Sequence, residues 1–238
     1  MFGRVVVVRT AEGEWRRVQT TPDGYDGWMH AGYLTVVDDP EIARLLAGGD
    51  ATGMQPSGAV HVSLGCTIRT GDRTLRLPLG AWVGPDVTVL DGDVVPMGEL
   101  PEQFPRGGDA IARTAARYFG STSYQWGGVT PWGADCSGFV QTVLALHGVD
   151  LPRDASQQVR AGTDAGRELA AHAAGDLLFF SEREDGRVTH VGLAAGGGRM
   201  LHVALGRGGF ADEELAADDD PYVATLRARF VGARRVLG

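Results

Sequence analysis

The pattern of apolar and polar positions divides the chain into an all-β first part and a mixed second part. Before residue 100, short strand-like apolar runs alternate with turn-forming Gly, Pro and Asp residues. The predicted strands are Val5–Val8, Trp15–Val18, Gly27–His30, Tyr33–Val37, Val60–Val62, Thr67–Arg69, Thr74–Leu77, Ala81–Val83 and Val87–Val95. Within the last run, Asp91-Gly92 predicts a hairpin turn. Residues 38–57 form a predicted linker with one short helix, Ile42–Leu46.

After residue 105, predicted helices come first and predicted strands follow. Asp109 is the expected N-cap of a helix over Ala110–Phe119, and a second helical period begins at Cys136 and ends near Gly148. The remaining predicted elements are a short helix opened by Arg153–Ser156, the strands Leu177–Phe180, Val188–Ala194, Arg199–Ala204 and Phe230–Leu237, and a surface loop over 206–221. This order is typical of an α+β domain, in which helices pack on an antiparallel sheet.

Cys136 stands where a glycine-rich aromatic loop gives way to a helix. Asp135 is a natural N-cap, which places Cys136 in the first helical turn. The helix dipole and the first-turn amides stabilise negative charge there, so we expect this thiol to be shifted towards thiolate. A lone helix cysteine is more often a buried core residue, and the flanking sequence is what favours a nucleophile.

Two of the six histidines fall on consecutive predicted strands. His190 opens one strand and His202 lies on the next, after the turn Gly196-Gly197-Gly198. Antiparallel neighbours joined by such a turn can bring both imidazoles to one face. Cys136, His190 and His202 then have the order of a papain-like triad of nucleophile, base and orienting residue. The same three residues could bind zinc, but the Cys-x-x-Cys spacing of zinc sites is missing.

Composition narrows the function classes further. The net charge of −8 and the pI near 5.2 argue against nucleic acid or an anionic membrane as the main partner. Lysine is absent, which removes Schiff-base chemistry and leaves a thiol as the best nucleophile. There are 2 cysteines, and a catalytic Cys136 must stay reduced, so Cys66 is expected to be a buried apolar residue without a disulfide. We expect no metal and no cofactor.

The motifs of the second part resemble a known family. Residues 124–140 read Tyr-Gln-Trp-Gly-Gly-Val-Thr-Pro-Trp-Gly-Ala-Asp-Cys-Ser-Gly-Phe-Val. With Arg153-Asp-Ala-Ser-x-Gln, Gly175-Asp-Leu, His190-Val-Gly and His202, they are similar to the NlpC-type papain-like cell-wall endopeptidases. The resemblance covers residues 105–237 and implies a papain-like α+β fold.

Earlier in the chain, Trp15-x-x-Val18 and Asp23-Gly-Tyr25-x-Gly-Trp28 resemble the second half of a bacterial SH3-like barrel. Trp15 and Trp28 are then expected in the barrel core. The resemblance implies three domains: an SH3-like barrel over 1–40, a second small SH3-like β domain over 41–100 and a cysteine peptidase domain over 101–238.

Family members with such barrels cleave the γ-D-glutamyl-L-diamino acid bond of peptidoglycan peptides that carry a free N-terminal L-Ala. The resemblance implies Cys136 as nucleophile, His190 as base and His202 as the orienting residue. It also implies substrate contacts. Tyr25 and Asp135 would bind the alanine amine, Ser137 and Ser156 the D-Glu α-carboxylate, and Trp126 would form a wall of the pocket.

Two other functions stay open on the sequence. A thiol amidase or acyltransferase on the same fold would share Cys136 and His190 without needing Tyr25 or Ser156. A non-catalytic cell-wall-binding module would use the barrels alone. We expect a monomer that acts in the cytoplasm on recycled wall peptides, because no signal peptide is visible; secretion is the alternative if the true start lies upstream.

Overall fold

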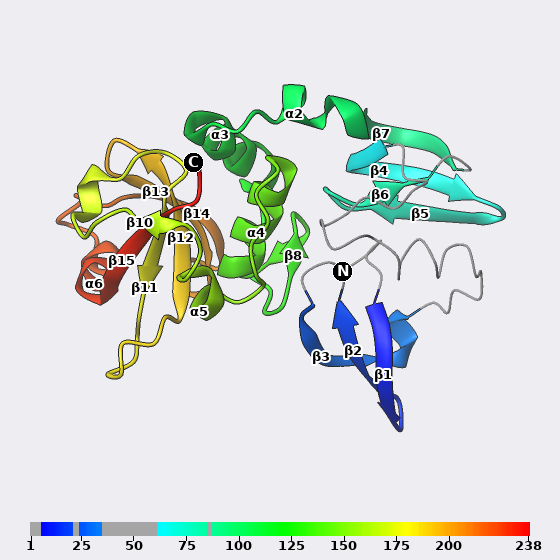
Figure 1. Cartoon of the computed structure of the whole chain (residues 1–238), viewed down its shortest axis with the longest axis horizontal. Helices are drawn as coiled ribbons and strands as arrows, with labels where there is room; N and C mark the ends of the chain where they lie inside the picture. Colours follow the sequence, from blue (N-terminus) through cyan, green and yellow to red (C-terminus); the bar gives the residue numbers. More distant parts are fainter. Residues whose placement is uncertain (1–5, 21–23, 35–60, 85–86) are drawn as a thin grey trace. The chain divides into compact units, whose positions relative to one another are not determined.

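The structure is a computed structural model that describes residues 6–20, 24–34, 61–84 and 87–238. The chain divides into a first unit, Phe2–Met97, and a second unit, Gly98–Gly238 (Figure 1). The predicted linker and its helix Ile42–Leu46 lie outside the described residues. Among the residues described, no helix is long and apolar enough to cross a membrane.

The first unit begins with an antiparallel sheet of three strands in the order β1 (Val6–Glu12), β2 (Trp15–Thr20), β3 (Asp26–His30). The short 3-10 helix η1 (Ala31–Tyr33) follows, so the strand predicted to begin at Tyr33 is wrong at its first residue. The reason is local, because the His30 imidazole accepts a hydrogen bond from the Gly32 amide and caps a helical turn.

Trp15 and Trp28 do not fill a core in this sheet. Their side chains are 51% and 47% exposed, so their predicted burial is wrong for the part of the chain that the structure describes. Trp15 instead packs edge-on against the His30 ring across the β2–β3 pair, with the ring centroids 5.6 Å apart. The two tryptophans therefore lie on the surface of the described sheet.

A second sheet in the first unit contains β4 (His61–Thr70), β5 (Arg73–Leu77), β6 (Trp82–Val83) and β7 (Thr88–Pro96). The hairpin turn predicted at Asp91-Gly92 is wrong, because β7 continues through it and Gly92 pairs with Cys66. Gly92 has a φ of 79°, and a Cβ there would lie 2.3 Å from the Gly65 carbonyl oxygen. The glycine thus allows a bulge and a close strand approach rather than a turn. Cys66 is buried and unpaired in this sheet, as predicted.

The second unit is built on six strands in the order β10, β15, β11, β12, β13, β14, with every neighbouring pair antiparallel. The strands are β10 (Thr163–Asp164), β11 (Leu177–Phe180), β12 (His190–Gly196), β13 (Arg199–Ala204), β14 (Gly209–Glu214) and β15 (Phe230–Arg235). The short helix η2 (Met97–Glu99) spans the boundary between the two units in the sequence. The other helices are α2 (Leu100–Gln103), α3 (Gly108–Phe119), α4 (Cys136–Leu146), α5 (Ala155–Gln158), η3 (Leu169–Ala171), η4 (Leu205–Arg207) and α6 (Pro221–Arg229). A small hairpin, β8 (Val129–Thr130) and β9 (Gly133–Ala134), precedes α4. The predicted combination of helices with an antiparallel sheet is confirmed.

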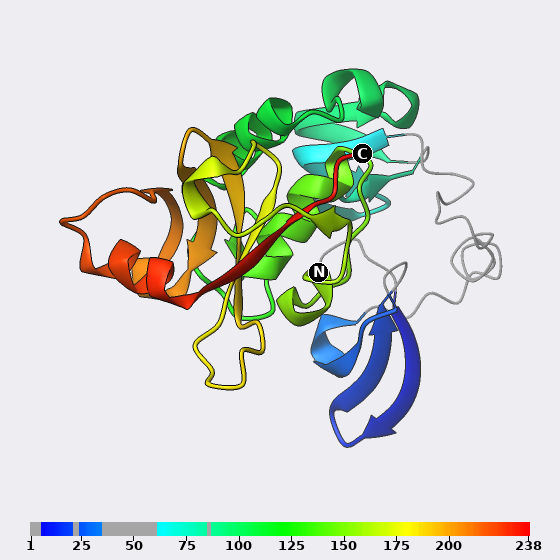
Figure 2. The same ribbon diagram turned by 60° about the vertical axis from the view of Figure 1, so that its left-hand side comes forward.

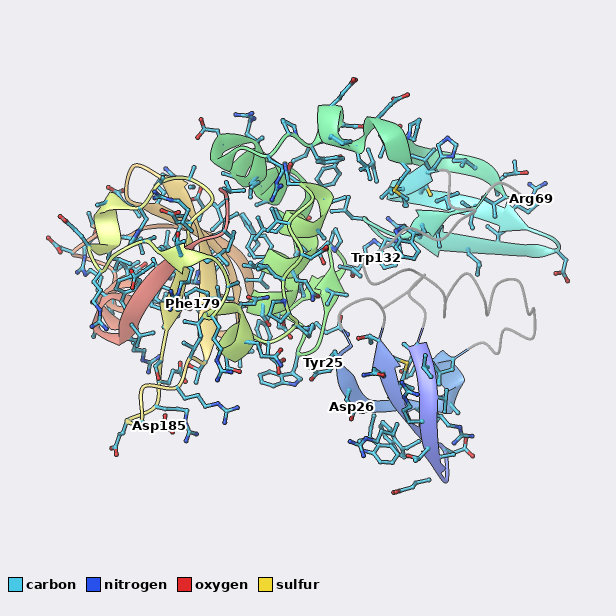
Figure 3. All side chains as sticks on the ribbon, in the orientation of Figure 1. Tyr25, Asp26, Arg69, Trp132, Phe179 and Asp185 are labelled. Carbon is cyan, nitrogen blue, oxygen red and sulfur yellow. The ribbon has the colours of Figure 1, made fainter. Side chains whose placement is uncertain are left out.

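Helices cover both faces of this sheet. Figures 1 and 2 show α3 and α4 on one side of it and α6 on the other. Phe119 of α3 packs edge-on against Phe139 of α4, and Phe139 packs against Phe210 of β14. Phe179 on β11 is fully buried and points into the body of the unit (Figure 3). This packing holds the first turn of α4 against the middle of the sheet.

The surface loop predicted over 206–221 is wrong. The segment contains η4 and the edge strand β14, and Asp220 caps the start of α6 through the amides of Tyr222 and Val223. β14 has few apolar residues, so its backbone pairing with β13 left little signal in the sequence. The N-cap predicted at Asp109 is also displaced, because α3 begins at Gly108 and its cap is Gly107.

Candidate active site

The nucleophile candidate stands at the first position of α4. Asp135 caps the helix as predicted, accepting a hydrogen bond from the Gly138 amide at 2.8 Å. Two glycines allow the preceding loop to press against this turn: a Cβ on Gly128 would lie 2.4 Å from the Gly133 carbonyl oxygen, and one on Gly138 would lie 2.1 Å from the Gly128 carbonyl oxygen. Cys136 is buried in the turn that results.

His190 and His202 lie side by side, as the strand pattern predicted. β12 and β13 are antiparallel neighbours, and the Nε2 atom of His190 lies 2.8 Å from the Nδ1 atom of His202. The turn between them has three glycines with positive φ. Both ring nitrogens of His202 have hydrogen-bond partners, since its Nε2 lies 3.2 Å from Glu213 Oε1. This arrangement orients two imidazoles and fits a zinc ligand set poorly.

The Cys136 sulfur lies at the beginning of β12. The backbone amide of Val191, which directly follows His190, acts on this thiol and lowers its pKa, as does the amide of Ser137. The structure therefore brings together the three residues proposed as a triad from the sequence. Their roles in a reaction stay a prediction.

Burial determines the protonation states of Cys136 and His190. It raises the pKa of the Cys136 thiol to about 11, because the Val191 and Ser137 amides and the Arg153 charge compensate only in part. The thiolate expected from the helix position alone is therefore wrong for the resting structure. Burial and the neighbouring His202 lower the pKa of His190 to about 3. Thiol and imidazole are both neutral near pH 7.

A raised thiol pKa has a measurable consequence. We expect alkylation of Cys136 by iodoacetamide to accelerate about tenfold per pH unit up to pH 9.0, because only the thiolate reacts and its fraction keeps rising below the pKa. The rate is measured by intact mass in a Cys66→Ala background, so that one thiol reports. A plateau reached below pH 8 would instead mean a preformed thiolate and contradict this picture.

Tyr124 is a further member of the site. It belongs to the motif of residues 124–140, but the sequence did not predict a role for it. Burial, together with the charges of Cys136 and Asp135, raises the pKa of its phenol to about 12. The phenol therefore keeps its proton at neutral pH and can donate a hydrogen bond beside the sulfur. A tyrosine in the loop before a helix N-terminus carried no signal of this role by itself.

Arg153 is the second member that the sequence reasoning did not assign. Its guanidinium binds Asp135 through two hydrogen bonds, of 2.9 Å to Oδ1 and 2.6 Å to Oδ2, and also donates to the Ser137 hydroxyl at 2.9 Å. Asp135 accepts further hydrogen bonds from the amides of Gly127 and Gly138. The pair is buried, with 6% and 11% of the two side chains exposed. A substrate amine would therefore bind to the Asp135 carboxylate, which already accepts several hydrogen bonds.

Ser156 and Trp126, which we predicted to contact substrate, lie in different surroundings. Ser156 is half-buried on α5, and Gln158 of that helix donates to the Ser137 carbonyl at 3.1 Å, which ties α5 to the first turn of α4. Trp126 is 86% exposed in the loop before β8. Tyr25 belongs to the first unit (Figure 3), and its contact with substrate stays a prediction.

Glu213 on β14 is the last residue of the site. The sequence did not predict it, because residues 206–221 were expected to form a surface loop. Only the alternation of inward positions Ala211, Glu213 and Leu215 could have indicated a strand that turns an acid towards the interior. Burial acts against its ionisation, but hydrogen bonds from His202 and Arg207 lower the pKa of Glu213 to about 2. A buried negative charge therefore lies next to His202, on the opposite side from His190.

Comparisons with known proteins agree on one family. The sequence profile of the NlpC/P60 family matches residues 121–219. Over 222 residues the chain is 32% identical to a gamma-D-glutamyl-L-lysine dipeptidyl-peptidase of Bacillus subtilis (strain 168), covering 85% of this chain and 70% of that protein. A protein of the same name from Bacillus cereus (strain ATCC 10987 / NRS 248) is 30% identical over 226 residues, which are 85% of this chain and 65% of that protein. A crystal structure of an NlpC/P60 family protein from Bacillus cereus ATCC 10987 has a similar fold, with a TM-score of 0.72 at 22% identity over 98% of this chain and 79% of that chain.

Proposed function

The chain belongs to the NlpC/P60 family, and on this premise we propose that Cys136 hydrolyses the bond between the γ-carboxyl group of D-Glu and an L-diamino acid in peptidoglycan peptides. It is a cysteine peptidase. The observation that carries the proposal is the contact of His190 with His202, next to the Val191 amide that acts on the Cys136 thiol, in a chain that is similar to γ-D-glutamyl-L-lysine dipeptidyl-peptidases over 85% of its length.

The first half of the reaction forms an acyl-enzyme. Nε2 of His190 faces His202, so its Nδ1 takes the proton of the Cys136 thiol as the sulfur attacks the γ-carbonyl carbon. A C–S bond forms and the carbonyl electron pair moves to oxygen. The tetrahedral intermediate then collapses, and the amine of the diamino acid leaves with the proton from His190. Because thiol and imidazole are neutral at rest, proton transfer accompanies the attack rather than preceding it.

The second half releases the product. Water gives a proton to His190 and adds to the thioester carbonyl carbon. The thiolate of Cys136 leaves and recovers the proton from the imidazolium. The products are L-Ala-D-Glu and a peptide or amino acid with a free diamino acid amine.

Two donors are placed to stabilise the oxyanion of both intermediates. The backbone amide of Cys136 lies at the first position of α4, where the helix dipole favours negative charge. The protonated phenol of Tyr124 is the second donor in this proposal. One such donor lowers the barrier by roughly 3 kcal/mol.

Recognition of a γ-linked D-residue needs groups that bind both ends of L-Ala-γ-D-Glu. We assign Asp135 and Tyr25 to the alanine amine, Ser137 and Ser156 to the α-carboxylate, and Trp126 to a wall of the pocket. The contact between Arg153 and the Ser137 hydroxyl supports the carboxylate assignment, because it places positive charge behind that serine. The antiparallel sheets of the first unit, to which Tyr25 belongs, are compatible with SH3-like domains.

An amine-binding site predicts discrimination against a blocked N-terminus. We expect N-acetylation of L-Ala-γ-D-Glu-L-Lys to lower kcat/KM by about 100-fold or more, because the acetyl group removes the charge that a buried carboxylate pairs with. The measurement compares initial rates on the two peptides by mass spectrometry. Equal rates would remove the role assigned to Tyr25 and Asp135 and leave the hydrolysis itself standing.

Product identity tests the function. The protein is incubated with L-Ala-γ-D-Glu-L-Lys and with the isomer linked through the α-carboxyl group, and the products are separated by mass. We expect L-Ala-D-Glu and lysine from the γ-linked peptide alone. Release of alanine, equal cleavage of both isomers, or no cleavage of either would overturn the proposed bond specificity and favour an amidase, an acyltransferase or a binding module.

A further inference from the structure

A hydrogen-bonded chain of side chains extends from the histidine pair through the edge of the sheet. His202, which is fully buried, lies between His190 on one side and Glu213 on the other, at 2.8 Å and 3.2 Å. Arg207 binds Glu213 through two hydrogen bonds, of 2.7 Å to Oε1 and 2.9 Å to Oε2, and also pairs with Asp220 at the start of α6. Four elements, β12, β13, β14 and η4, thus contribute to one network.

The carboxylate restricts where the protons of the two imidazoles can be. An ionised carboxylate only accepts hydrogen bonds, so Nε2 of His202 must carry its proton towards Glu213. In neutral His202 the Nδ1 atom is then an acceptor, and His190 must donate to it from Nε2. The remaining nitrogen of His190, Nδ1, is left with its lone pair, which is the form a base for the thiol requires.

We infer that Glu213 is a positioning residue, which fixes both imidazoles in their Nε2–H tautomers and stabilises the positive charge that His190 acquires when it takes the Cys136 proton. This inference rests on the proposed function and assigns it a residue beyond the Cys-His-His set. Without the acceptor at Glu213, His202 can adopt the other tautomer and leave His190 with the wrong nitrogen protonated.

The other charged and titratable groups around the pair suit this role. They are Cys136 from α4, Arg207 from η4, and Asp220 and Tyr222 at the start of α6. Arg207 holds both Glu213 oxygens and stacks over the Tyr222 ring at 4.4 Å, so the carboxylate has a fixed orientation. Its positive charge also keeps Glu213 ionised, which preserves an acceptor on the His202 side.

The test uses two substitutions of the full chain, Glu213→Gln and Glu213→Leu. Glutamine keeps an acceptor oxygen without the charge, and leucine removes both. The matched control is Glu214→Gln, the same change on the next residue of β14, where the side chain is exposed. Two readouts are taken: kcat and KM on L-Ala-γ-D-Glu-L-Lys, and the tautomers of His190 and His202 from long-range ¹H–¹⁵N spectra of histidine-labelled protein without substrate.

We expect Nε2–H tautomers for both histidines in the unaltered protein, in the glutamine variant and in the control. In the leucine variant we expect the His202 tautomer to change and kcat to fall by about 10- to 100-fold with little change in KM, and the glutamine variant to lie between. A glutamine variant with unaltered kcat, or a leucine variant with unaltered tautomers, overturns the inference. If the leucine variant does not fold, kcat of the glutamine variant decides. Because the spectra need no turnover, an inactive unaltered protein would refute the proposed function while the tautomers still decide this inference.

Discussion

Replacing Cys136 by alanine is expected to lower kcat/KM for the γ-linked peptide by at least about 10⁴-fold, because no other group in the site can form the thioester. The fold should persist, since Asp135 still caps α4 and alanine fits where the thiol stood. Circular dichroism and thermal unfolding check the fold, and product formation by mass spectrometry checks the activity.

The second cysteine provides the matched control. Cys66 is buried between strands of the first unit, whereas Cys136 belongs to the second unit. Cys66→Ala should lower thermal stability through the loss of packing and leave kcat unchanged. Hydrolysis that survives Cys136→Ala, or that is lost in Cys66→Ala alone, would contradict the assignment of the nucleophile.

Replacing Arg153 by methionine is expected to lower the free energy of unfolding by about 3–5 kcal/mol. The change leaves the carboxylate of Asp135 buried without its partner, in the loop that forms the first turn of α4. Hydrolysis should also be lost, because the same carboxylate caps the helix that begins with Cys136. Urea denaturation of the full chain, followed by tryptophan fluorescence, gives the stability difference.

An exposed ion pair of the same chemistry serves as the control for this change. Arg183 and Asp185 pair in the loop between β11 and β12, with about half of each side chain exposed, and Asp185 lies at the tip of that loop (Figure 3). Arg183→Met should leave the stability almost unchanged, because water screens an exposed ion pair. If the free energies of unfolding of the two methionine variants differ by less than about 1 kcal/mol, the buried Arg153–Asp135 pair does not stabilise the fold as we expect.

The local signals in the sequence were enough to place the core of the site. Asp135 caps a helix because its side chain suits the N-cap and an apolar helical period follows it, and both facts are visible within a few residues. His190 and His202 meet because a glycine turn joins two short strands. The NlpC/P60 family and the cysteine peptidase activity were predicted from the same motifs and are confirmed.

The features that the sequence did not predict depend on long-range contacts. β14 pairs through its backbone and has a polar sequence, so the alternation of Ala211, Glu213 and Leu215 was only a weak signal for the strand and for the inward direction of Glu213. The pKa of Cys136 is raised because distant segments bury it, whereas the sequence shows only the helix end that would lower it. Gly92 was assigned to a turn because a bulge that faces Gly65 needs the same residue type.

The most direct test of the account is capture of the acyl-enzyme. The chain is mixed with L-Ala-γ-D-Glu p-nitroanilide, whose good leaving group makes release of the thioester the slow step, then quenched in acid and digested for mass spectrometry. We predict a peptide containing Cys136 that is heavier by the mass of L-Ala-D-Glu less one water, and no such adduct on Cys66. Rapid release of nitroaniline without an adduct on Cys136, or an adduct of alanine alone, would contradict attack by this thiol on the γ-carbonyl of D-Glu.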